Sequence, residues 1–584
     1  MKNFLSICPH LAVNMPFIEN VDGARVQMSA SQCRQAVPLV NNEIPMVVTT
    51  FEDSDILIPD IQKSKKDGVI VFCNERCMII KYIDDTYDIF RLFYDYTIKR
   101  NDGEVKQGEV LAYKTGYFVN GSLAQGKNLL TAIMSHPDTY EDAIVMSKSA
   151  IDSGLLDSYQ YVSIDKSINA TDILLSIDNE RYKPIPFIHD KFRKGDPLLK
   201  IKNFSSNVER LYEPSNDVIA SNDCEIVQVD VVPYKFNNMV REYEVKMKEY
   251  QYNNKQLLKE IESKDLPDYI MYKFKTINHI YNYDQPVSNN KTNIGVHIKM
   301  TYRTIERPEV GDKFSNRYAN KGVISKLLPD NEMPVLSDGR IAQVIINPMS
   351  IISRMNIGQL YEVAASNCIY KLILMILESK ESDLENLKEL ILRFYATLDN
   401  TTEKFVTYQM SEFLSKVKMI DDLKMNVNEF VFPSPPFEST KRSQLLEAMD
   451  ILGVKDLVDA KYLGNDIQIN AGYMYFYRLM HIASHKISGR SIGSFSPKTF
   501  QPVGGRHRGG GQRFGEMEVW TLMSYGSLEN LREIISVKSD DMTSKLSYVY
   551  SVLYNSSSSM KAMNTESYKL LQSYLSILGV KLNP

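Results

Sequence analysis

The spacing of apolar residues changes near residue 356, and this change restricts the chain to a mixed fold. From Ile294 to Tyr302, apolar residues alternate with other side chains, which is the period of a half-buried strand. Asn356 has the position of a helix N-cap, with Gln359 three residues on, and helical spacing continues through residues 366–430. The sequence therefore predicts an α+β protein with a β-rich body and helical additions.

Shorter patterns extend this prediction along the chain. Residues 68–82 and 103–112 have the β-branched runs and glycine turns of short strands. Residues 236–264 are rich in lysine and glutamate at helical spacing, which predicts a solvated helix or pair of helices. Residues 489–515 form the largest irregular stretch, and a final helical segment follows them.

Length, charge and cysteine content limit the function classes. A chain of 584 residues is too long for one compact core, so the sequence predicts a multidomain protein. The net charge of -4 argues against a protein that coats nucleic acid, so such contacts require positive charge gathered locally. Cys73 and Cys77 have no partner pair at zinc-ligand spacing, so no zinc is expected. The most apolar run, 368–377, is about half of the ~20 residues of a membrane span, so a soluble intracellular protein without membrane contact is expected.

The loop from Gly311 to Gly322 carries three cations, Lys313, Arg317 and Lys321. Glycines at both ends allow tight turns and close approach of the backbone to a ligand, and flexible lysines suit phosphate oxygens. The spacing is not that of a Walker loop. On charge alone, a solvated basic loop is the favoured interpretation of the pattern.

Two further stretches carry charges that suit phosphate chemistry. Arg354 lies just before the predicted helix start, where free N–H groups already favour an anion, and a guanidinium there could hold a triphosphate. A pairing of Arg354 with a neighbouring carboxylate is the alternative. Glu141 and Asp142 precede a short apolar strand and could help to hold Mg²⁺, although two acidic residues at a turn are common.

The last unusual stretch, residues 504–515, combines glycines with Arg506, Arg508 and Arg513. A disordered segment that contacts single strands would have a similar composition. This stretch leads directly into residues 516–520, which contain the only tryptophan, and that context favours an ordered loop.

Taken together and in this order, these stretches resemble the β (second-largest) subunit of multisubunit DNA-dependent RNA polymerases. The resemblance covers the chain from about residue 15 onward, is weakest across 160–290, and is closest to the split form found in large phages. The motifs that carry it are GGQRFGEMEVW at 510–520, GDK…NKGVIS at 311–325, SRMNIGQ at 353–359, RQAVP at 34–38, Glu141-Asp142, GYMY at 472–475, Arg490-Ser491 with Gly493, and VKSDD at 537–541.

The resemblance implies roles for individual residues around the reaction centre. Lys313 and Lys321 would contact phosphates of the RNA 3′ end or of the initiating nucleotide, and Arg354 with Arg25 would hold the incoming triphosphate. Asp142, with Glu141, would lie near the second Mg²⁺, as an indirect or weak ligand. Phosphoryl transfer needs positioning and charge stabilisation as pyrophosphate leaves, which such cations supply.

The same resemblance implies contacts to nucleic acid outside that centre. Gln35 would lie along the nascent RNA. The glycine loop 504–515 would be a switch segment that touches the RNA–DNA hybrid. The remaining nucleic-acid-binding residues that it implies are Arg317, Arg490, Arg506, Arg508 and Arg513.

The domains expected from the resemblance divide the chain into six regions. They are a fork and external-region remnant (1–45), a hybrid-binding double-psi β-barrel (46–160 and 290–365), a reduced flap-like insertion (161–289), a mostly helical segment (366–470), an active-site and switch region (471–520) and a C-terminal segment that packs against the clamp (521–584).

Three departures from the family pattern accompany these matches. The family's histidine before the ARS-type motif falls at Ser488, with His485 one turn earlier as a replacement candidate. The family's GRHG tract reads Asn316-Arg-Tyr-Ala319. The chain starts just upstream of the RQAVP motif, so the family's N-terminal lobe is expected on a separate N-terminal β-like chain.

The sequence contains no Asp-x-Asp-Gly-Asp cluster, so the catalytic Mg²⁺ is expected on a β′-like partner chain. Further expected partners are the DNA template, the RNA product, NTPs and a specificity factor. Abundant Asn, Ile, Lys and Tyr fit a virus or phage, which places the protein in the host cytoplasm or the virion. The alternatives are an inactive polymerase-like scaffold or decoy, and a polymerase with both barrels in one chain.

Overall fold

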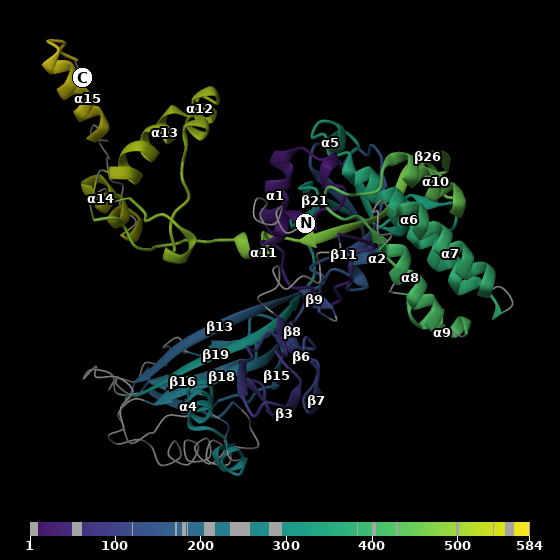
Figure 1. The fold of residues 1–584 in the computed structure, drawn as a ribbon. Coiled ribbons are helices and arrows are strands. Elements are labelled where there is room, and N and C mark those ends of the chain that lie inside the picture. The colour runs from purple at the N-terminus through teal and green to yellow at the C-terminus, as the bar shows by residue number, and fades with distance from the viewer. Residues whose placement is uncertain are drawn as a thin grey trace. The chain divides into compact units, whose positions relative to one another are not determined.

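The computed structural model shows two compact units, Met1–Ala483 and Ser484–Pro584 (Figure 1). Each unit has its own helices, and the strands among the described residues lie in the first unit. The described residues are 10–49, 61–119, 121–169, 172–177, 183, 185–203, 217–233, 257–264, 266–278, 295–381, 384–399, 405–417, 419–427, 430–497, 501–540, 542–554 and 566–582.

Six strands at the centre of the first unit close into a ring. Their order is β11-β23-β12-β21-β20-β26, and β26 pairs back onto β11. The pairs β11–β23 and β12–β21 are parallel, and the other pairs are antiparallel. The bounds are Lys127–Ile133 (β11), Ala143–Ser147 (β12), Lys313–Asn316 (β20), Lys321–Leu328 (β21), Val344–Ile346 (β23) and Asn465–Arg478 (β26).

Apolar side chains from these strands form two neighbouring core clusters. One contains Ile144, Ile324 and Phe476, and the other contains Val145 and Ile345. Residues next to each other on one strand thus lie in different clusters, as expected where both faces of a sheet are covered. β22 (Val335–Leu336) and β25 (Val458–Tyr462) extend the sheet beyond β26.

The predicted barrel ranges, 46–160 and 290–365, leave out β26. Its 14 residues lie at 465–478, after the helical segment, yet they pair with both β20 and β11 and close the ring. Strand pairing across more than 300 residues leaves no local trace in the sequence.

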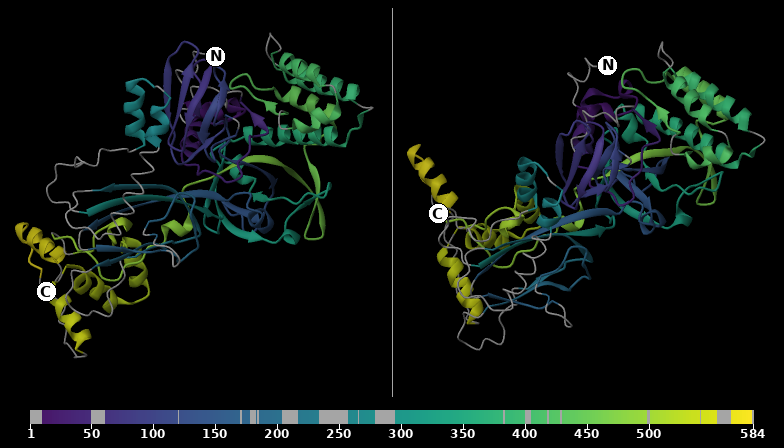
Figure 2. Two further views of the ribbon diagram at one scale, coloured as in Figure 1. Left: turned by 90° about the horizontal axis from the view of Figure 1, so that it is seen from below. Right: turned by 60° about the horizontal axis from the view of Figure 1, so that its bottom comes forward.

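Five helices group together (Figure 1), and the first of them, α6 (Gly358–Glu378), packs on β26. Side chains from these helices form one core cluster with the short parallel pair β1 (Val47–Val48) and β24 (Phe432–Pro433) (Figure 2 shows the helices from two further sides). The prediction of a mostly helical stretch across 366–430 is confirmed. The helices are α6 (Gly358–Glu378), α7 (Leu384–Leu398), α8 (Phe405–Lys416), α9 (Ile420–Met425) and α10 (Arg442–Leu452).

Helix α6 is the one helix among the described residues with the length and composition to cross a membrane. Half of its apolar window is buried inside the protein, and Cys368, Ile369 and Leu372 are completely buried in the core shared with α7 and α10. The apolarity of α6 is therefore that of a core helix.

The predicted cap of α6 is wrong in position. The helix starts at Gly358, and the side chain of Asn356 is buried and donates its amide hydrogen to the carbonyl of Tyr318 at 3.0 Å. Asn356 therefore ties the start of α6 to the loop between β20 and β21 instead of capping the helix.

Two long paired strands, β13 (Ser158–Asn169) and β19 (Gly295–Glu306), connect the ring to further small sheets. The half-buried strand predicted at 294–302 is confirmed from residue 295 on in β19, because Ile298, Met300 and Tyr302 are buried, and residue 294 lies outside the described residues. The companion sheets are β13-β19-β18-β15 and β14-β16-β17, with β14 (Asp172–Leu175), β15 (Lys191–Phe192), β16 (Pro197–Asn203), β17 (Val218–Ile219) and β18 (Cys224–Pro233).

The predicted strands at 68–82 and 103–112 are confirmed, but the two strands within 103–112 do not pair with each other. Residues 103–105 pair in β5-β4-β3-β7, whereas residues 110–114 pair in β2-β8-β6. The bounds are β2 (Ile61–Lys63), β3 (Gly68–Cys73), β4 (Cys77–Tyr82), β5 (Tyr87–Arg91), β6 (Tyr96–Ile98), β7 (Gly103–Val105), β8 (Val110–Lys114), β9 (Phe118–Val119) and β10 (Ser122–Leu123). The helices predicted at 236–264 lie mostly outside the described residues, and α4 (Asp268–Ile277) follows them.

Short helices complete both units. In the first unit they are η1 (His10–Asn14), η2 (Ile18–Asn20), α1 (Gly23–Cys33), α2 (Lys148–Asp152), η3 (Asp330–Glu332) and α5 (Met349–Ile352). α11 (Ala483–Lys486) lies at the boundary, and the second unit contains η6 (Arg506–Arg508), α12 (Glu516–Ser524), α13 (Leu528–Ile535), the π-helical turn η7 (Ser536–Asp540), α14 (Met542–Leu553) and α15 (Glu566–Ile577). The predicted helical segment after residue 515 is thereby confirmed.

Candidate nucleotide and nucleic-acid site

The β20–β21 hairpin presents Lys313 and Lys321 on one face. Lys313 is opposite Val323 and Ser315 is opposite Lys321, so the two lysines are diagonal neighbours in the register. Such positions lie about 7–8 Å apart at the backbone, within reach of one phosphate chain for long side chains. Lys321 is exposed and Lys313 is half-buried, so their ammonium groups can meet a ligand on this face.

The guanidinium of Arg354 lies beside the hairpin and is held by two side chains. Its Nη2 forms an ion pair with the carboxylate of Asp142, and its Nη1 donates to Oδ1 of Asn320 at 3.2 Å. The carbonyl oxygen of Asp142 accepts from the backbone N–H of Val323 at 3.2 Å, two residues after Lys321 on the same strand. Asp142 and Arg354, for which the sequence suggested a metal role and a phosphate role, are therefore paired with each other, as the alternative of an arginine–carboxylate pair predicted.

A hydrogen-bond network extends from Asn320 into the protein. Its Nδ2 donates to Oγ of Ser350 at 3.2 Å, and that hydroxyl donates to the carbonyl of Asn347 at 2.6 Å. Asn347 in turn donates to the carbonyl of Thr139 at 2.8 Å. The α5 segment is thus joined to the loop before β12.

A small hollow of about 10 Å³ lies between this network and Asp142, lined also by Glu141, Asn347 and Ser350. That volume is close to the ~10–15 Å³ that one water molecule requires, so an anion as large as a triphosphate would lie on the surface beside it. Glu141 is exposed and adopts a left-handed backbone conformation (φ 52°).

Among the described residues no group of three His, Cys, Asp or Glu side chains could hold a metal ion. Asp142 and Glu141 can supply at most part of a coordination shell for Mg²⁺, which prefers six oxygen ligands. Cys73 and Cys77 flank the β3–β4 turn, and burial raises the pKa of the Cys77 thiol to about 11, which disfavours its thiolate form.

Segment 478–481 brings Gln35 next to the hairpin. The N–H of Met480 donates to the carbonyl of Gln35 at 2.9 Å, and the N–H of Leu479 donates to the carbonyl of Lys313 at 2.9 Å. Helix α1 packs on the loop after β20 through Ser29, whose hydroxyl donates to the carbonyl of Arg317. Arg25 lies on the first turn of α1 and its side chain is half-exposed.

Arg317 does not fit the predicted contact to nucleic acid. Its side chain is 1% exposed, its Nη2 lies 2.5 Å from Oε1 of Glu362, and its Nη1 donates to the carbonyl of Val47 at 2.7 Å. Burial lowers the pKa of Arg317, but the Glu362 carboxylate together with Tyr318 and Tyr477 outweighs burial, so the pKa stays above its ordinary value. Arg317 is a structural cation that holds the loop 316–320 against α6.

The sequence reasoning missed a second buried ion pair, between Asp312 and Arg478. Nη2 of Arg478 lies 2.8 Å from Oδ2 of Asp312, and the other carboxylate oxygen accepts from the N–H of Ala483 at 2.8 Å. Arg478 also donates to the carbonyls of Glu306 and Arg307. The sequence does show an aspartate, Asp312, directly before Lys313 in the glycine-bounded loop, and this aspartate was a signal for an ion pair. Its partner could not be recognised, because Arg478 lies 166 residues further along the chain.

In the second unit, Arg490 folds back on its own loop. It donates to the carbonyls of Gly509 and Ser494, and its guanidinium lies 5.3 Å from the centre of the Phe495 ring. These three contacts of Arg490 hold the glycine-rich stretch in one conformation through residues of the same loop. Arg506, Arg508 and Arg513 are exposed, as a nucleic-acid contact requires.

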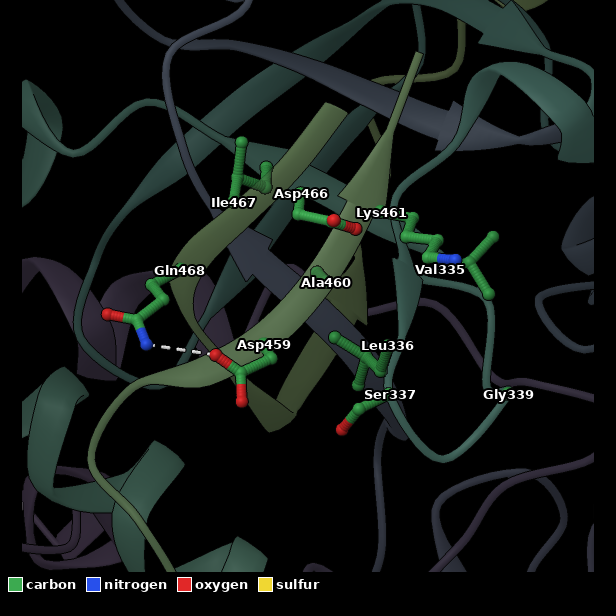
Figure 3. A pocket seen from close by; sticks show the side chains of 10 residues that line it. All are labelled: Val335, Leu336, Ser337, Gly339, Asp459, Ala460, Lys461, Asp466, Ile467 and Gln468. Carbon is green, nitrogen blue, oxygen red and sulfur yellow. Dashed lines mark hydrogen bonds between the residues drawn. The ribbon is translucent and has the colours of Figure 1, made fainter. Parts of the chain in front are cut away.

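A larger hollow of about 600 Å³ lies on the β22-β25-β26 sheet (Figure 3). Asp459, Lys461, Asp466 and Gln468 surround it, and Gln468 donates to Asp459 at 2.9 Å. None of the predicted site residues lines it. The candidate site therefore remains the β20–β21 hairpin with Asp142 and Arg354.

The chain matches known families along nearly its whole length. Residues 11–508 match the family "RNA polymerase Rpb2, domain 6", and residues 510–584 match "RNA polymerase Rpb2, domain 7". Curated proteins similar to it are "DNA-directed RNA polymerase subunit beta" of Ureaplasma parvum serovar 3 (26% identical over 99% of this chain and 42% of that protein), of Euglena longa (28%, 97% and 50%) and of Caldicellulosiruptor saccharolyticus (28%, 100% and 42%).

The chain therefore spans half or less of the length of these relatives. The predicted resemblance is confirmed: this protein belongs to the Rpb2-type family of RNA polymerase β subunits and corresponds to the C-terminal part of such a subunit.

Proposed function

We propose that this chain is the C-terminal β-type subunit of a DNA-dependent RNA polymerase and forms half of an active site shared with a β′-type chain. The observation that supports this most is the assembly of Lys313, Lys321, Arg354 and Asp142 around one hairpin, from segments more than 200 residues apart. Three cations beside one carboxylate suit a triphosphate that leaves as pyrophosphate.

In this proposal Arg354, with Arg25, binds the triphosphate of the incoming nucleotide, while Lys313 and Lys321 bind phosphates of the RNA 3′ end or initiating nucleotide. Gln35 lies along the RNA. Mg²⁺ would neutralise the developing charge on the leaving group. Asp142, with Glu141, would be a minor or indirect ligand of the second ion, and the β′-type chain would hold most of the metal.

The incomplete site favours a shared active centre over a self-contained polymerase. The hollow beside Asp142 has space for about one water molecule, so the remaining walls of a nucleotide site would come from a partner. The closed six-strand ring is proposed to be the double-psi barrel, with β13–β19 and the attached sheets as the flap-like insertion.

The second unit is proposed to carry the switch and clamp contacts. Arg490, Arg506, Arg508 and Arg513 would contact the RNA–DNA hybrid. The apolar side chains on α12 to α15 that are exposed in this chain, among them Met517 and Trp520, would pack against the largest subunit. An N-terminal β-like chain, template DNA and a specificity factor complete the proposed partners. A viral or phage source would place the complex in the host cytoplasm or the virion.

The test is purification of a tagged copy with its partners, mass spectrometry of those partners, and primer extension. Co-purifying β- and β′-like chains with template- and Mg²⁺-dependent RNA synthesis are expected. Arg354→Ala should reduce synthesis strongly, and Arg393→Ala, an exposed arginine on α7, should not. Unchanged synthesis with Arg354→Ala would favour the alternative of an inactive scaffold or decoy.

A further inference from the structure

The orientation of the Arg354 side chain, which is proposed to bind the triphosphate, depends on the residues around it. It lies in the turn between α5 and α6, where the next residue, Met355, adopts a left-handed backbone conformation (φ 54°). Its side chain is 19% exposed, so its guanidinium is largely enclosed and reaches a ligand in only a few directions. The groups that hold it therefore decide whether it can meet a phosphate.

The two groups that hold Arg354 differ in charge. Asp142 is a carboxylate with 41% of its side chain exposed, and a triphosphate competes with it for the same cation. Asn320 is neutral and only 8% exposed, and its Oδ1 accepts from Nη1 at 3.2 Å. A neutral acceptor orients a guanidinium without cancelling the charge that binds the ligand.

The amide of Asn320 is itself locked in one orientation. Its Nδ2 faces the hydroxyl of Ser350, whose proton goes to the carbonyl of Asn347 at 2.6 Å, so that hydroxyl acts as the acceptor for Nδ2. A flipped amide would point a donor at the donor Nη1 of Arg354 and would leave its oxygen without a proton from Ser350.

The backbone of Asn320 is fixed as well. Its N–H donates to Oδ1 of Asn316 at 3.1 Å, and its carbonyl accepts from the N–H of Asn316 at 3.3 Å. The next residue is Lys321, the first of β21. The buried residue Asn320 therefore links Arg354 with the exposed Lys321, and both of these cations are proposed to bind phosphate.

We propose that Asn320 is a positioning residue that aims the Arg354 guanidinium at the nucleotide triphosphate, with Ser350 locking its amide and Asp142 as the partner that the triphosphate displaces. This inference rests on the proposed function of Arg354. The orientation of the Arg354 guanidinium then comes from a neutral side chain, Asn320, on the loop that leads into Lys321.

The experiment measures KM and kcat for NTP incorporation by the polymerase assembled with its partner chains. The variants are Asn320→Ala, Arg354→Ala and the double variant, with Asn465→Ala at the exposed start of β26 as the matched control. Asn320→Ala is expected to raise KM for NTP about tenfold with a smaller change in kcat, because ground-state binding of the triphosphate is weakened. In the Arg354→Ala background the same substitution should have little further effect.

Two supplementary variants keep the test decisive if Asn320→Ala fails to assemble. Ser350→Ala, which frees the amide to rotate, should raise KM about two- to threefold. Asn320→Asp retains the acceptor but adds a charge that competes with the triphosphate, so KM should rise while Arg354 stays held.

The outcomes separate the two levels of the proposal. If Arg354→Ala leaves KM and kcat unchanged, the triphosphate role of Arg354 is wrong, and the positioning role is wrong with it. If Arg354→Ala is impaired but Asn320→Ala and Ser350→Ala are normal, only the positioning role is wrong. Additive effects in the double variant would also overturn it, because Asn320 would then act independently of Arg354.

Discussion

The guanidinium of Arg478 lies 2.8 Å from the carboxylate of Asp312, and the two side chains are 0% and 1% exposed. This ion pair joins the end of β26 to the residue before Lys313, so the strand that closes the ring also fixes the loop of the candidate site. A buried charge without its partner is costly, which makes this pair a sensitive point of the fold.

Asp312→Ala should destabilise the first unit by about 3–5 kcal/mol, because the Arg478 charge remains buried and unpaired. The measurement is urea denaturation followed by circular dichroism. Asp466→Ala, an exposed aspartate on β26, should change stability by about 0.5 kcal/mol or less. A similar loss in both variants would contradict the role of the buried pair.

Gly322→Ala should weaken the parallel pairing of β12 with β21. A Cβ atom at this position would lie 2.3 Å from the carbonyl oxygen of Asp142 and 2.5 Å from Cγ1 of Ile144, so the strand backbones must separate. The expected loss is about 1–3 kcal/mol in the same denaturation experiment. Gly23→Ala is the control, because nothing lies within 4 Å of its added Cβ atom.

His189 should make the stability of the sheet that contains β18 depend on pH, because its partner Glu225 lies on that strand. Hydrogen bonds to the carboxylates of Glu225 and Glu75 raise its pKa above the ordinary value. Because the pKa of His189 is raised in the folded state, the stabilisation that the protonated ring provides is fully present below the unfolded pKa of about 6.5. This stabilisation is lost as pH rises through the folded pKa.

The melting temperature of His189→Gln is therefore expected to fall below that of the unsubstituted chain near pH 5.5, and to match it near pH 8.5. Glu75→Gln and Glu225→Gln should reduce this pH dependence, because each removes one acceptor of the imidazolium. A difference in melting temperature that is the same at both pH values would show that the two carboxylates do not hold the charged ring.

Arg506, Arg508 and Arg513 should contribute to hybrid binding through their charge. Substitution of all three by Gln should weaken binding of the assembled polymerase to an RNA–DNA hybrid, and should lower the slope of log K against log salt by about one per lost phosphate contact. Arg393→Gln on α7 is the control. An unchanged salt slope in the triple variant would remove these arginines from the proposed interface.

The sequence by itself determined the class, the family and most local elements, because periodicity and contiguous motifs are local properties. The strand at 294–302, the helices across 366–430 and the GGQRFGEMEVW tract could all be recognised from neighbouring residues. The phosphate-facing roles of Lys313 and Lys321 rest on the same motifs and stay predictions.

Only the tertiary structure decided which charged side chains are buried and which distant residues contact each other. Arg317 and Lys321 belong to one basic loop in the sequence, yet Arg317 is buried against Glu362 and Lys321 is exposed. Strand β26 and the partners Asp142 and Arg354 come from distant segments. Such pairings depend on which strands close the ring and on the burial that follows from it, and neither is encoded in the spacing of neighbouring residues.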